Sequence, residues 1–491
     1  MSFVSWEFVA FFALVLAGLR LMPTRSSRQI MLLVANAVFY GSGTTWHLLV
    51  LAAPALVDYA CAVRIEDARD DRERRRWLLV SLVSNLGLLA YFKYANFFVD
   101  NVAALFGLST APLDIALPVG ISFFLFKTMS YTIDVYRREI PACRSMWRYA
   151  MFVSFFPELV AGPIVRASVF LPQMERTLEL SWRRTAMGLQ MVLLGLSKKM
   201  LVADRLAMFV DPVFTAPAAY SQGTVICAVI AYSIQIYCDF SGYSDIAIGV
   251  ARIVGFDLPE NFDMPYLATS ITEFWRRWHM TLSQWLRDYL YVPLGGNRRG
   301  ALRTYVNLLV TMLLGGLWHG ASWTFVFWGL LHGVGLAVHK FVRRGEPVVR
   351  RGHSWQSGST TVLAWATTYA FVCVAWVFFR ARDFSTASLV LRKMAGLEAG
   401  GASWVYVPFW MLAGAVAFAH VVGMLAARRG TTNQELAAGG RVVIARPHAQ
   451  AGLYVAFARN GFTSAFVLTA WLVVLYLFVP LHTSPFIYFR F

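Results

Sequence analysis

The amino-acid sequence predicts an all-helical protein that crosses a membrane many times. Hydrophobic residues make up 58% of its 491 residues and charged residues only 14%, and the mean hydropathy is +0.55. These values lie outside the range of soluble globular domains. Because a spanning helix needs about 20 apolar residues, the apolar segments would supply roughly eleven to thirteen crossings. We therefore expect one transmembrane domain over residues 1–491 and no large soluble domain.

Apolar segments follow one another along the chain and are separated by short basic loops. Three arginines follow the first segment, and six more lie between residues 64 and 76. Positive loops stay in the cytoplasm, so this pattern places the N-terminus outside. The first segment lacks the basic start and the cleavage site of a signal peptide, so we expect it to be retained as a helix. The predicted spans include Phe3–Leu21, Ile30–Gly43, Trp46–Val63, Trp77–Leu108, Ile115–Tyr136, Arg184–Val210, Thr224–Tyr237, Thr324–Val338, Val362–Phe379, Trp404–Leu425 and Phe462–Val479.

Two segments differ from a simple spanning helix. In SFFPELVAGPIVR, residues 154–166, two prolines and a glycine interrupt an apolar run that is too short to span. Broken backbone is tolerated at membrane depth where protein or a water-filled cavity shelters it, so we predict a re-entrant segment. The polar segment from Arg428 to Asn460 is predicted to be a cytoplasmic loop.

Charge, cysteines and missing motifs exclude several functions. The formal charge is +17, but the basic residues lie in short bursts between apolar runs. This distribution favours topology signals, anionic lipids or cofactor phosphates over nucleic acid. The five cysteines are widely spaced and contain no CxxC pair, so we expect neither a disulfide framework nor a thiolate metal site. A GxSxG serine-nucleophile motif is absent. HExxH, a P-loop and GxGxxG followed by a helix are absent too, which argues against the commonest metalloprotease, NTPase and dinucleotide-binding functions.

Asp239 and Asp245 lie in the apolar sequence YCDFSGYSDIAIGVARIVGF. Carboxylates are costly at membrane depth, so a functional or cavity-lining role is the default interpretation. The alternative is that both residues lie at a helix end in the membrane interface, where they cost little.

The segment from Glu273 to Tyr289 shows the three-four spacing of an amphipathic helix. Its apolar face includes Trp275, Trp278 and Trp285, which suits the membrane interface. His279 lies at the edge of this aromatic stripe, where a lone histidine could simply reach toward the interface. The glycine-rich turn that follows carries three arginines that could bind phosphates or serve only as topology signals, namely Arg298, Arg299 and Arg303.

His319 lies in a strongly apolar segment, LLVTMLLGGLWHGASWTFVFWGLLHG. A histidine at that depth must be hydrogen-bonded, line a cavity or take part in catalysis, and we favour a cavity or catalysis. A neutral histidine can take a proton from a hydroxyl that attacks an acyl carbonyl. A second histidine could orient the acceptor or stabilise the developing oxyanion. His332 and His339 are expected to be structural or interfacial.

The central motifs FWRRWHMTLSQWLRDYLYVPLGGNRRG and GGLWHGASWTFVFWGLLHG resemble those of the membrane-bound O-acyltransferases (MBOAT). The likeness is to the bacterial AlgI-like branch of polysaccharide O-acetyltransferases and, more distantly, to DltB-like D-alanyl transfer proteins. It extends through YFKYANFF, LPVGISFFLFKTMSYTIDVYR, FFPELVAGPIVR and IYCDFSGYSDIAIGVARIVGFDLPENFDMPYLATSITEFW, and to the C-terminal SPFIYFRF. The resemblance therefore covers nearly the whole chain.

This resemblance implies a ring of membrane helices around a central tunnel, with a catalytic core at about residues 115–340 and further helices at 360–491. His319 matches the family's hallmark histidine, and His279 matches its partner position. The family implies no bound cofactor or metal; acetyl-CoA or an acyl carrier protein thioester would be the cytoplasmic donor. We expect further residues to line the tunnel or bind substrate, namely Trp275, Arg276, Arg277, Trp278, Asp239, Tyr243, Asp245, Asn297 and Trp318.

By the same resemblance, the chain would be an inner-membrane acyltransferase that supports O-acetylation of an exported polysaccharide, alginate being the type case. A periplasmic protein of the SGNH, AlgX or AlgJ kind would complete the transfer to the polysaccharide. Two alternatives stay open: acylation of a lipid, peptidoglycan or teichoic acid, and a non-enzymatic transporter that uses the polar insertions as a path.

Overall fold

The computed structural model describes residues 1–109, 111–176, 180–343, 358–429, 461–478, 484, 486 and 487. Over these residues the chain forms helices and loops without a β-strand, which confirms the predicted all-helical class. Eight helices in this part of the chain are long and apolar enough to cross a membrane. The sequence predicted more, in part because α1 (Trp6–Leu21), α2 (Arg25–Gly41) and α6 (Ile121–Tyr136) are only 16, 17 and 16 residues long.

The chain forms two compact units. The first unit contains Met1–Gly188 and Ile246–Leu258, and the second contains Leu189–Asp245 and Pro259–Phe491. The long helix α11 (Gln222–Ile253) begins in the second unit and ends in the first. That residues 1–491 act as one catalytic domain stays a prediction.

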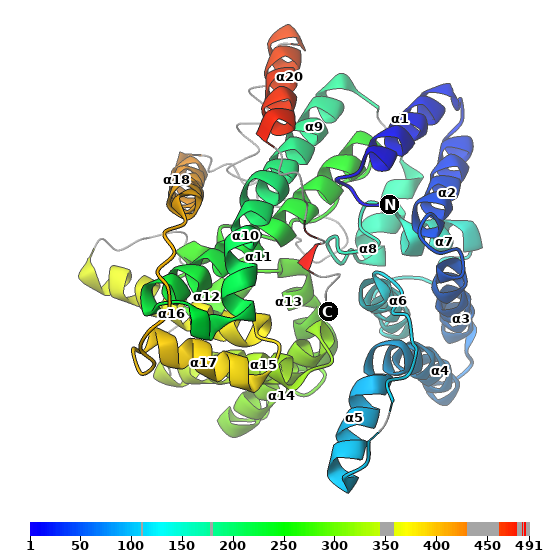
Figure 1. The fold of residues 1–491 in the computed structure, drawn as a ribbon. Coiled ribbons are helices and arrows are strands. Elements are labelled where there is room, and N and C mark those ends of the chain that lie inside the picture. The colour runs from blue at the N-terminus through cyan, green and yellow to red at the C-terminus, as the bar shows by residue number, and fades with distance from the viewer. Residues whose placement is uncertain are drawn as a thin grey trace. The chain divides into compact units, whose positions relative to one another are not determined.

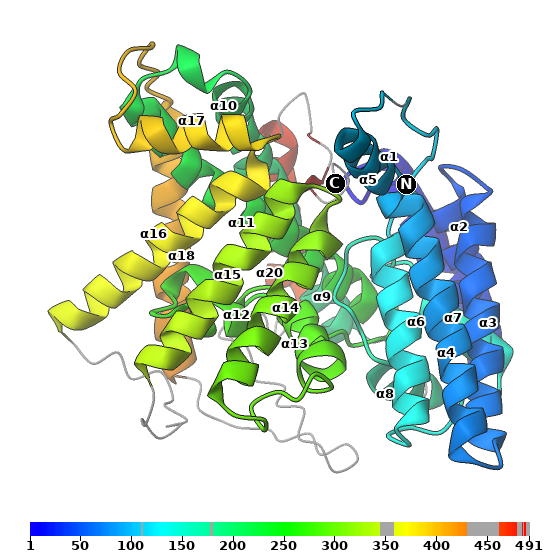
Figure 2. The same cartoon turned by 90° about the horizontal axis from the view of Figure 1, so that it is seen from below.

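In the first unit, α3 (His47–Asp67), α4 (Asp71–Leu89) and α6 pack side by side (Figure 1 and Figure 2). Buried polar side chains join them. Asp58 accepts hydrogen bonds from Ser81 at 2.6 Å and from Asn85 at 2.8 Å, and Asn85 accepts one from Thr128 at 3.0 Å. Because an unpaired polar group is costly in an apolar interior, these bonds fix the register of the three helices.

The segment between α7 (Met146–Ser154) and α8 (Ala167–Phe170) is irregular and buried from Phe155 to Val165, as its prolines and glycine predict. Its Glu158 forms a buried ion pair with Lys127 of α6. Pairing compensates two charges that would be very costly alone. The re-entrant path of this segment through a membrane stays a prediction.

In the second unit, α14 (Ala301–His319) and α15 (Trp323–Val342) form a tightly packed pair, and α16 (Ser359–Arg380) packs on α15 (Figure 2). The close approach depends on glycine. A Cβ atom at Gly316 would lie 2.3 Å from the backbone oxygen of Phe325 and 3.1 Å from the Cα atom of Gly329. These two glycines therefore bring the end of α14, and with it His319, against α15.

The remaining longer helices are α5 (Ala95–Phe106), α9 (Trp182–Leu196), α10 (Asp204–Thr215), α17 (Phe384–Met394), α18 (Val407–Arg429) and α20 (Gly461–Phe478). π-Helical turns occur at Ala90–Tyr94, Ser197–Ala203 and Arg287–Tyr291. Of the predicted cytoplasmic loop, Arg428 and Arg429 end α18, and residues 430–460 lie outside the described residues. Of SPFIYFRF, only Ser484, Phe486 and Ile487 lie within them.

Candidate active site

His279 lies in a turn between two short helices. The single amphipathic helix predicted from Glu273 to Tyr289 is wrong, because α12 (Ile271–Arg277) and α13 (Met280–Leu286) are separate. At the break, His279 has φ 41° and ψ 54°, in the left-handed region that residues with a side chain rarely adopt. Such backbone persists only where the surrounding contacts hold it, and it is common at functional sites.

Asn261 supplies those contacts. Its backbone oxygen accepts a hydrogen bond from the amide of Met280 at 2.9 Å. Its side-chain Oδ1 lies 3.2 Å from the amide nitrogen of Thr281 and 3.0 Å from Nδ1 of His279. One residue from the loop before α12 thus ties down three consecutive residues of the turn.

The aromatic residues around this turn are buried in protein. Trp275, Trp278 and Trp285 are only 8%, 1% and 9% exposed, so the expected position in the membrane interface is wrong. Trp278 packs against Trp376 of α16, with ring centroids 5.0 Å apart. Trp275 donates a hydrogen bond to Nδ1 of His332 at 3.2 Å, which gives His332 a structural contact. The three tryptophans therefore belong to the core of the second unit.

His319 is the last residue of α14 and is 3% exposed. Aromatic rings surround it: its centroid lies 4.9 Å from Trp318, 5.0 Å from Trp328 and 5.3 Å from Phe379. Large rings around an imidazole exclude water and hold its orientation.

The structure brings the two predicted histidines together. The ring centroids of His279 and His319 are 6.5 Å apart, and Trp318 contacts both rings. Two hydrogen bonds of about 3 Å and two ring radii of about 1 Å span up to roughly 8 Å, so both imidazoles can reach one small substrate group. These residues form a buried candidate active site within the second unit.

Helix α11 separates residues that contact this site from residues that do not. Phe240 meets the His279 ring edge-on at 4.7 Å, and Ser244, one turn later on the same face, lies 3.3 Å from Nδ2 of Asn261. Asp239 and Asp245 lie on other faces and pair with Lys199 and Lys198, each at 2.6 Å. Both carboxylates are thus compensated by ion pairs, and their role as tunnel groups stays a prediction.

The C-terminal segment contacts the same part of α11. The amide of Ile487 donates a hydrogen bond to Asp239 at 2.8 Å, and Tyr243 meets Phe486 edge-on at 4.5 Å. Lys199, the partner of Asp239, pairs with Asp204 as well, at 2.8 Å, so one lysine compensates two buried carboxylates. Asp239 and Tyr243 therefore help to anchor Ile487 and Phe486.

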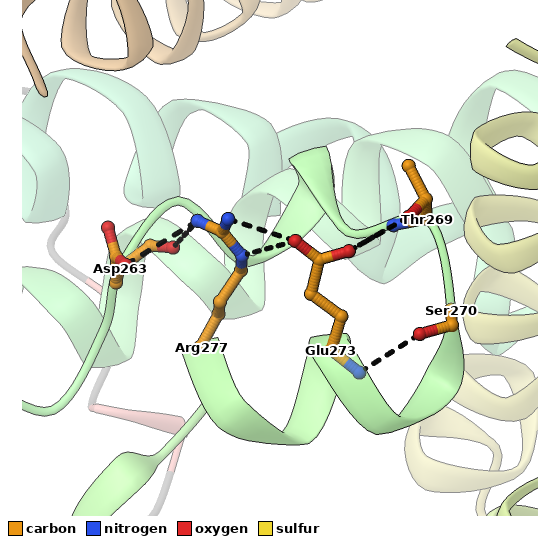
Figure 3. A network of polar contacts seen from close by, with 5 residues as sticks. All are labelled: Asp263, Thr269, Ser270, Glu273 and Arg277. Atoms are coloured by element: carbon orange, nitrogen blue, oxygen red, sulfur yellow. Dashed lines mark hydrogen bonds and ion pairs between the residues drawn. The ribbon is translucent and has the colours of Figure 1, made fainter. Parts of the chain in front are cut away.

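Arg277 belongs to a polar network at α12, which Figure 3 shows. It pairs with Glu273 at 2.9 Å and with Asp263 at 3.4 Å, and Glu273 accepts a hydrogen bond from the amide of Thr269 at 2.9 Å. Burial by itself would raise the pKa of Glu273, but the hydrogen bonds from Thr269 and the charge of Arg277 together lower it below its ordinary value. The network fastens the loop that carries Asn261 to α12, so Arg277 supports the site from outside.

Two other predicted residues lie at the surface. Arg276 is exposed, and Asn297 is exposed and contacts Tyr291 and Lys340. Among the residues that the structure describes, no group of three or more His, Cys, Asp or Glu side chains could hold a metal ion.

Burial controls the charge of His279, which is 0% exposed and lies outside the eight candidate spans. Removal from water disfavours the charged imidazole and lowers its pKa to about 3. His279 is therefore neutral at cellular pH, and neutral imidazole is the form that can accept a proton.

Sequence reasoning missed Asn261, Phe240, Trp328 and Phe379. Asn261 lies 18 residues before His279, in the polar loop ENFD, and nothing in the spacing links the two. A signal was nevertheless present, since a polar loop directly before an aromatic helix can supply the cap or turn contacts that the helix lacks.

Comparison with known proteins identifies the family. The membrane-bound O-acyltransferase family model matches residues 32–380. "Probable alginate O-acetylase AlgI" of Pseudomonas putida is 41% identical over 400 residues, covering 80% of this chain and 80% of that protein. "Peptidoglycan O-acetyltransferase" of Helicobacter pylori is 38% identical, over 75% of this chain and 74% of that protein.

A more distant relative, "Teichoic acid D-alanyltransferase" of Bacillus subtilis, is 27% identical over 54% of this chain and 69% of that protein. The three names describe different acceptors and share acyl transfer. The family match covers both histidines of the buried site and seven of the eight candidate spans wholly or in part. The chain is therefore a multi-pass membrane acyltransferase and belongs to the membrane-bound O-acyltransferase family.

Proposed function

We propose that the chain takes an acetyl group from a cytoplasmic thioester donor and passes it across the inner membrane for O-acetylation of an exported polysaccharide. The pair of buried histidines 6.5 Å apart carries this proposal. The names of several relatives at about 40% identity support the acetyl group and the polysaccharide. Acetyl-CoA or an acetylated acyl carrier protein is the donor.

His319 acts as the general base. An acceptor hydroxyl attacks the carbonyl carbon of the thioester, and its proton moves to His319 as the new C–O bond forms. The tetrahedral intermediate then collapses, the C–S bond breaks, and the leaving thiolate takes the proton back from His319. His279 is the partner that positions or polarises the reacting groups.

The acceptor hydroxyl belongs to the polysaccharide or to a periplasmic relay protein of the SGNH, AlgX or AlgJ kind. Trp278 and Trp318, which lie beside the two histidines, line the path. The N-terminus lies in the periplasm. The acyl donor binds from the cytoplasmic side of the membrane and the acceptor from the periplasmic side.

Peptidoglycan is the second candidate acceptor, because a relative with that name is 38% identical. Lipid and teichoic acid acceptors have weaker support, since the teichoic acid relative is only 27% identical. Because the chain belongs to an acyltransferase family, a non-enzymatic transporter is no longer favoured.

The test is transfer of labelled acetyl from acetyl-CoA or acetylated carrier protein by the purified chain in lipid nanodiscs. Alginate and peptidoglycan serve as acceptors, with and without an SGNH-type partner. His319→Ala should lower the rate by roughly 10²- to 10⁴-fold, the usual contribution of a general base. His339→Ala, a partly buried histidine that contacts Thr272, is the matched control and should keep the wild-type rate. Full activity in His319→Ala would exclude the assigned base.

A further inference from the structure

The hydrogen bonds around Asn261 determine which nitrogen of His279 carries its proton. Oδ1 of Asn261 faces the backbone amide of Thr281 at 3.2 Å. A backbone N–H can only donate, so the Asn261 atom that faces it must be the oxygen and not the NH₂ group. The Thr281 hydroxyl donates to the same oxygen at 2.9 Å.

The NH₂ group of Asn261 has a partner that supports this assignment. Nδ2 of Asn261 lies 3.3 Å from the hydroxyl oxygen of Ser244, which can accept a hydrogen bond. Both ends of the buried side chain therefore have partners of the correct type, and a flipped amide would place two N–H groups against each other.

The same oxygen lies 3.0 Å from Nδ1 of His279. Since an amide oxygen only accepts, Nδ1 must carry a hydrogen. The imidazole is neutral, because burial lowers its pKa to about 3, and a neutral imidazole carries one ring proton. Nε2 is then the nitrogen with the lone pair.

We propose that Asn261 is a positioning residue that holds His279 in the Nδ1–H tautomer, so that His279 meets substrate as a hydrogen-bond acceptor through Nε2. This inference rests on the proposed function and chooses between the two roles open to the second histidine. A neutral Nε2 lone pair cannot donate to a developing oxyanion. It can accept a hydrogen bond from a hydroxyl or amide N–H of a bound substrate other than the O–H that reacts at His319.

The backbone supports the same conclusion. His279 is in the left-handed conformation, and the residue that fixes its tautomer also accepts the amide hydrogens of Met280 and Thr281. Turn geometry and ring orientation are thus both set by Asn261, through its backbone oxygen at Met280 and its side-chain oxygen at His279 and Thr281. Removal of the side chain should release the ring and the Thr281 amide, while the backbone bond to Met280 remains.

The first test reads the tautomer directly. Full-length protein with ¹⁵N-labelled histidine, in nanodiscs at pH 7, is studied by solid-state NMR, which separates protonated ring nitrogens from those with a lone pair. The His279 signals are assigned by their loss in His279→Gln. We expect the proton on Nδ1 in the wild type and a shift of population toward Nε2–H in Asn261→Ala. A wild-type proton on Nε2, or an unchanged population in Asn261→Ala, would overturn the proposal.

Asn307→Ala is the matched control. Asn307 is a buried asparagine of the same unit, 1% exposed, and donates to the backbone oxygen of Gly296 at 3.1 Å. Its loss should leave the His279 tautomer unchanged, and a change there would mean that general destabilisation explains the Asn261 result. The NMR signal does not require turnover. The tautomer proposal can therefore fail while the acyltransferase function stands, and the tautomer proposal can hold while the acyltransferase function fails.

The second test separates positioning from folding. Asn261→Ala should lower kcat/KM for acetyl transfer by roughly ten- to a hundredfold, the range found when an orienting partner of a metal-bound histidine is removed. Asn261→Asp still accepts from Nδ1–H, but its negative charge favours the protonated imidazole.

Among the described rings beside His279, Phe240, Phe262 and Trp318 carry no titratable group, and His319 does. In Asn261→Asp the new carboxylate favours the protonated His279 ring. The acidic limb of the profile of kcat/KM against pH should therefore move to higher pH. An unmoved limb would mean that the side chain at position 261 does not face the His279 ring in the working protein, and that result would also overturn the proposal.

Discussion

The two histidines of the site are held by different means. His279 lies in a strained turn, and hydrogen bonds to Asn261 fix its backbone and its ring. His319 lies at the end of a 19-residue helix, and aromatic rings and a glycine contact between α14 and α15 fix its position. Loss of a nearby hydrogen-bonding side chain should therefore disturb His279 most. A change in the size of a nearby side chain should disturb His319 most.

Gly316→Ala should have the largest effect on the His319 side. The new Cβ atom would lie 2.3 Å from the backbone oxygen of Phe325, so α14 and α15 must move apart. A displacement of about 1 Å at a catalytic group can lower the rate on the order of 10²-fold. We expect that loss in the acetyl-transfer assay.

Gly414→Ala in α18 is the control for this prediction, because a Cβ atom there has no neighbour within 4 Å. It should keep full activity, and alanine is also the better helix former. Equal activity in both variants would mean that the close glycine contact does not position His319.

The His279 side can be tested by pH. The folded-state pKa is about 3, and an ordinary histidine in the unfolded chain has a pKa near 6.5. Between these values the unfolded state binds more protons, so the stability due to this group falls as the pH falls from 7. The expected loss is about 2 kcal/mol between pH 7 and pH 5.

The measurement is the free energy of unfolding in mixed micelles at both pH values. His279→Gln should lose less stability on acidification than the wild type by about that amount. His339→Gln is a control for the loss of a partly buried histidine. If the wild type and His279→Gln respond to pH in the same way, His279 is not a neutral buried group.

The sequence predicted the two sides of the site unequally. The apolar segment around His319 was sufficient to predict its burial, because a strongly apolar run leaves a histidine few alternatives. The break at His279 could not be predicted from helical spacing, since the apolar residues from Phe274 to Trp285 keep that spacing across the turn. What breaks the helix is a contact with Asn261, which is 18 residues away.

The same limit applies at other residues. Periodicity shows that Trp275 and Trp278 share a face, but the partner that covers the face, α16 through Trp376, comes much later in the chain. Asp239 and Asp245 were recognised as costly, but the lysines that pair with them lie on another helical segment. Local pattern predicts helices and burial, whereas partners depend on tertiary packing.

Phe379→Leu should have a smaller effect on the His319 side. Phe379 is 2% exposed and lies 5.3 Å from the imidazole. Leucine keeps most of the apolar volume and removes the ring, so the loss of stability should be about 1 kcal/mol and the loss of activity several-fold. Phe418→Leu, at a position that is 70% exposed, is the control and should change neither. A leucine variant with full activity would show that aromatic contact does not orient His319.

Arg277→Ala should have the smallest effect and tests the support of the His279 turn. Arg277 pairs with Glu273 and Asp263 (Figure 3), and its backbone oxygen accepts the amide of Asp263 at 2.9 Å, a bond that the alanine variant keeps. Because partly exposed ion pairs contribute about 0–1 kcal/mol, the loss of stability should be small. Activity should fall a few-fold, because the loop that carries Asn261 loosens when Arg277 no longer holds it. Arg276→Ala, next to it and exposed, should be neutral in the same assay. If Arg276→Ala is the more damaging of the two, charge at the surface matters more than the network that holds the Asn261 loop.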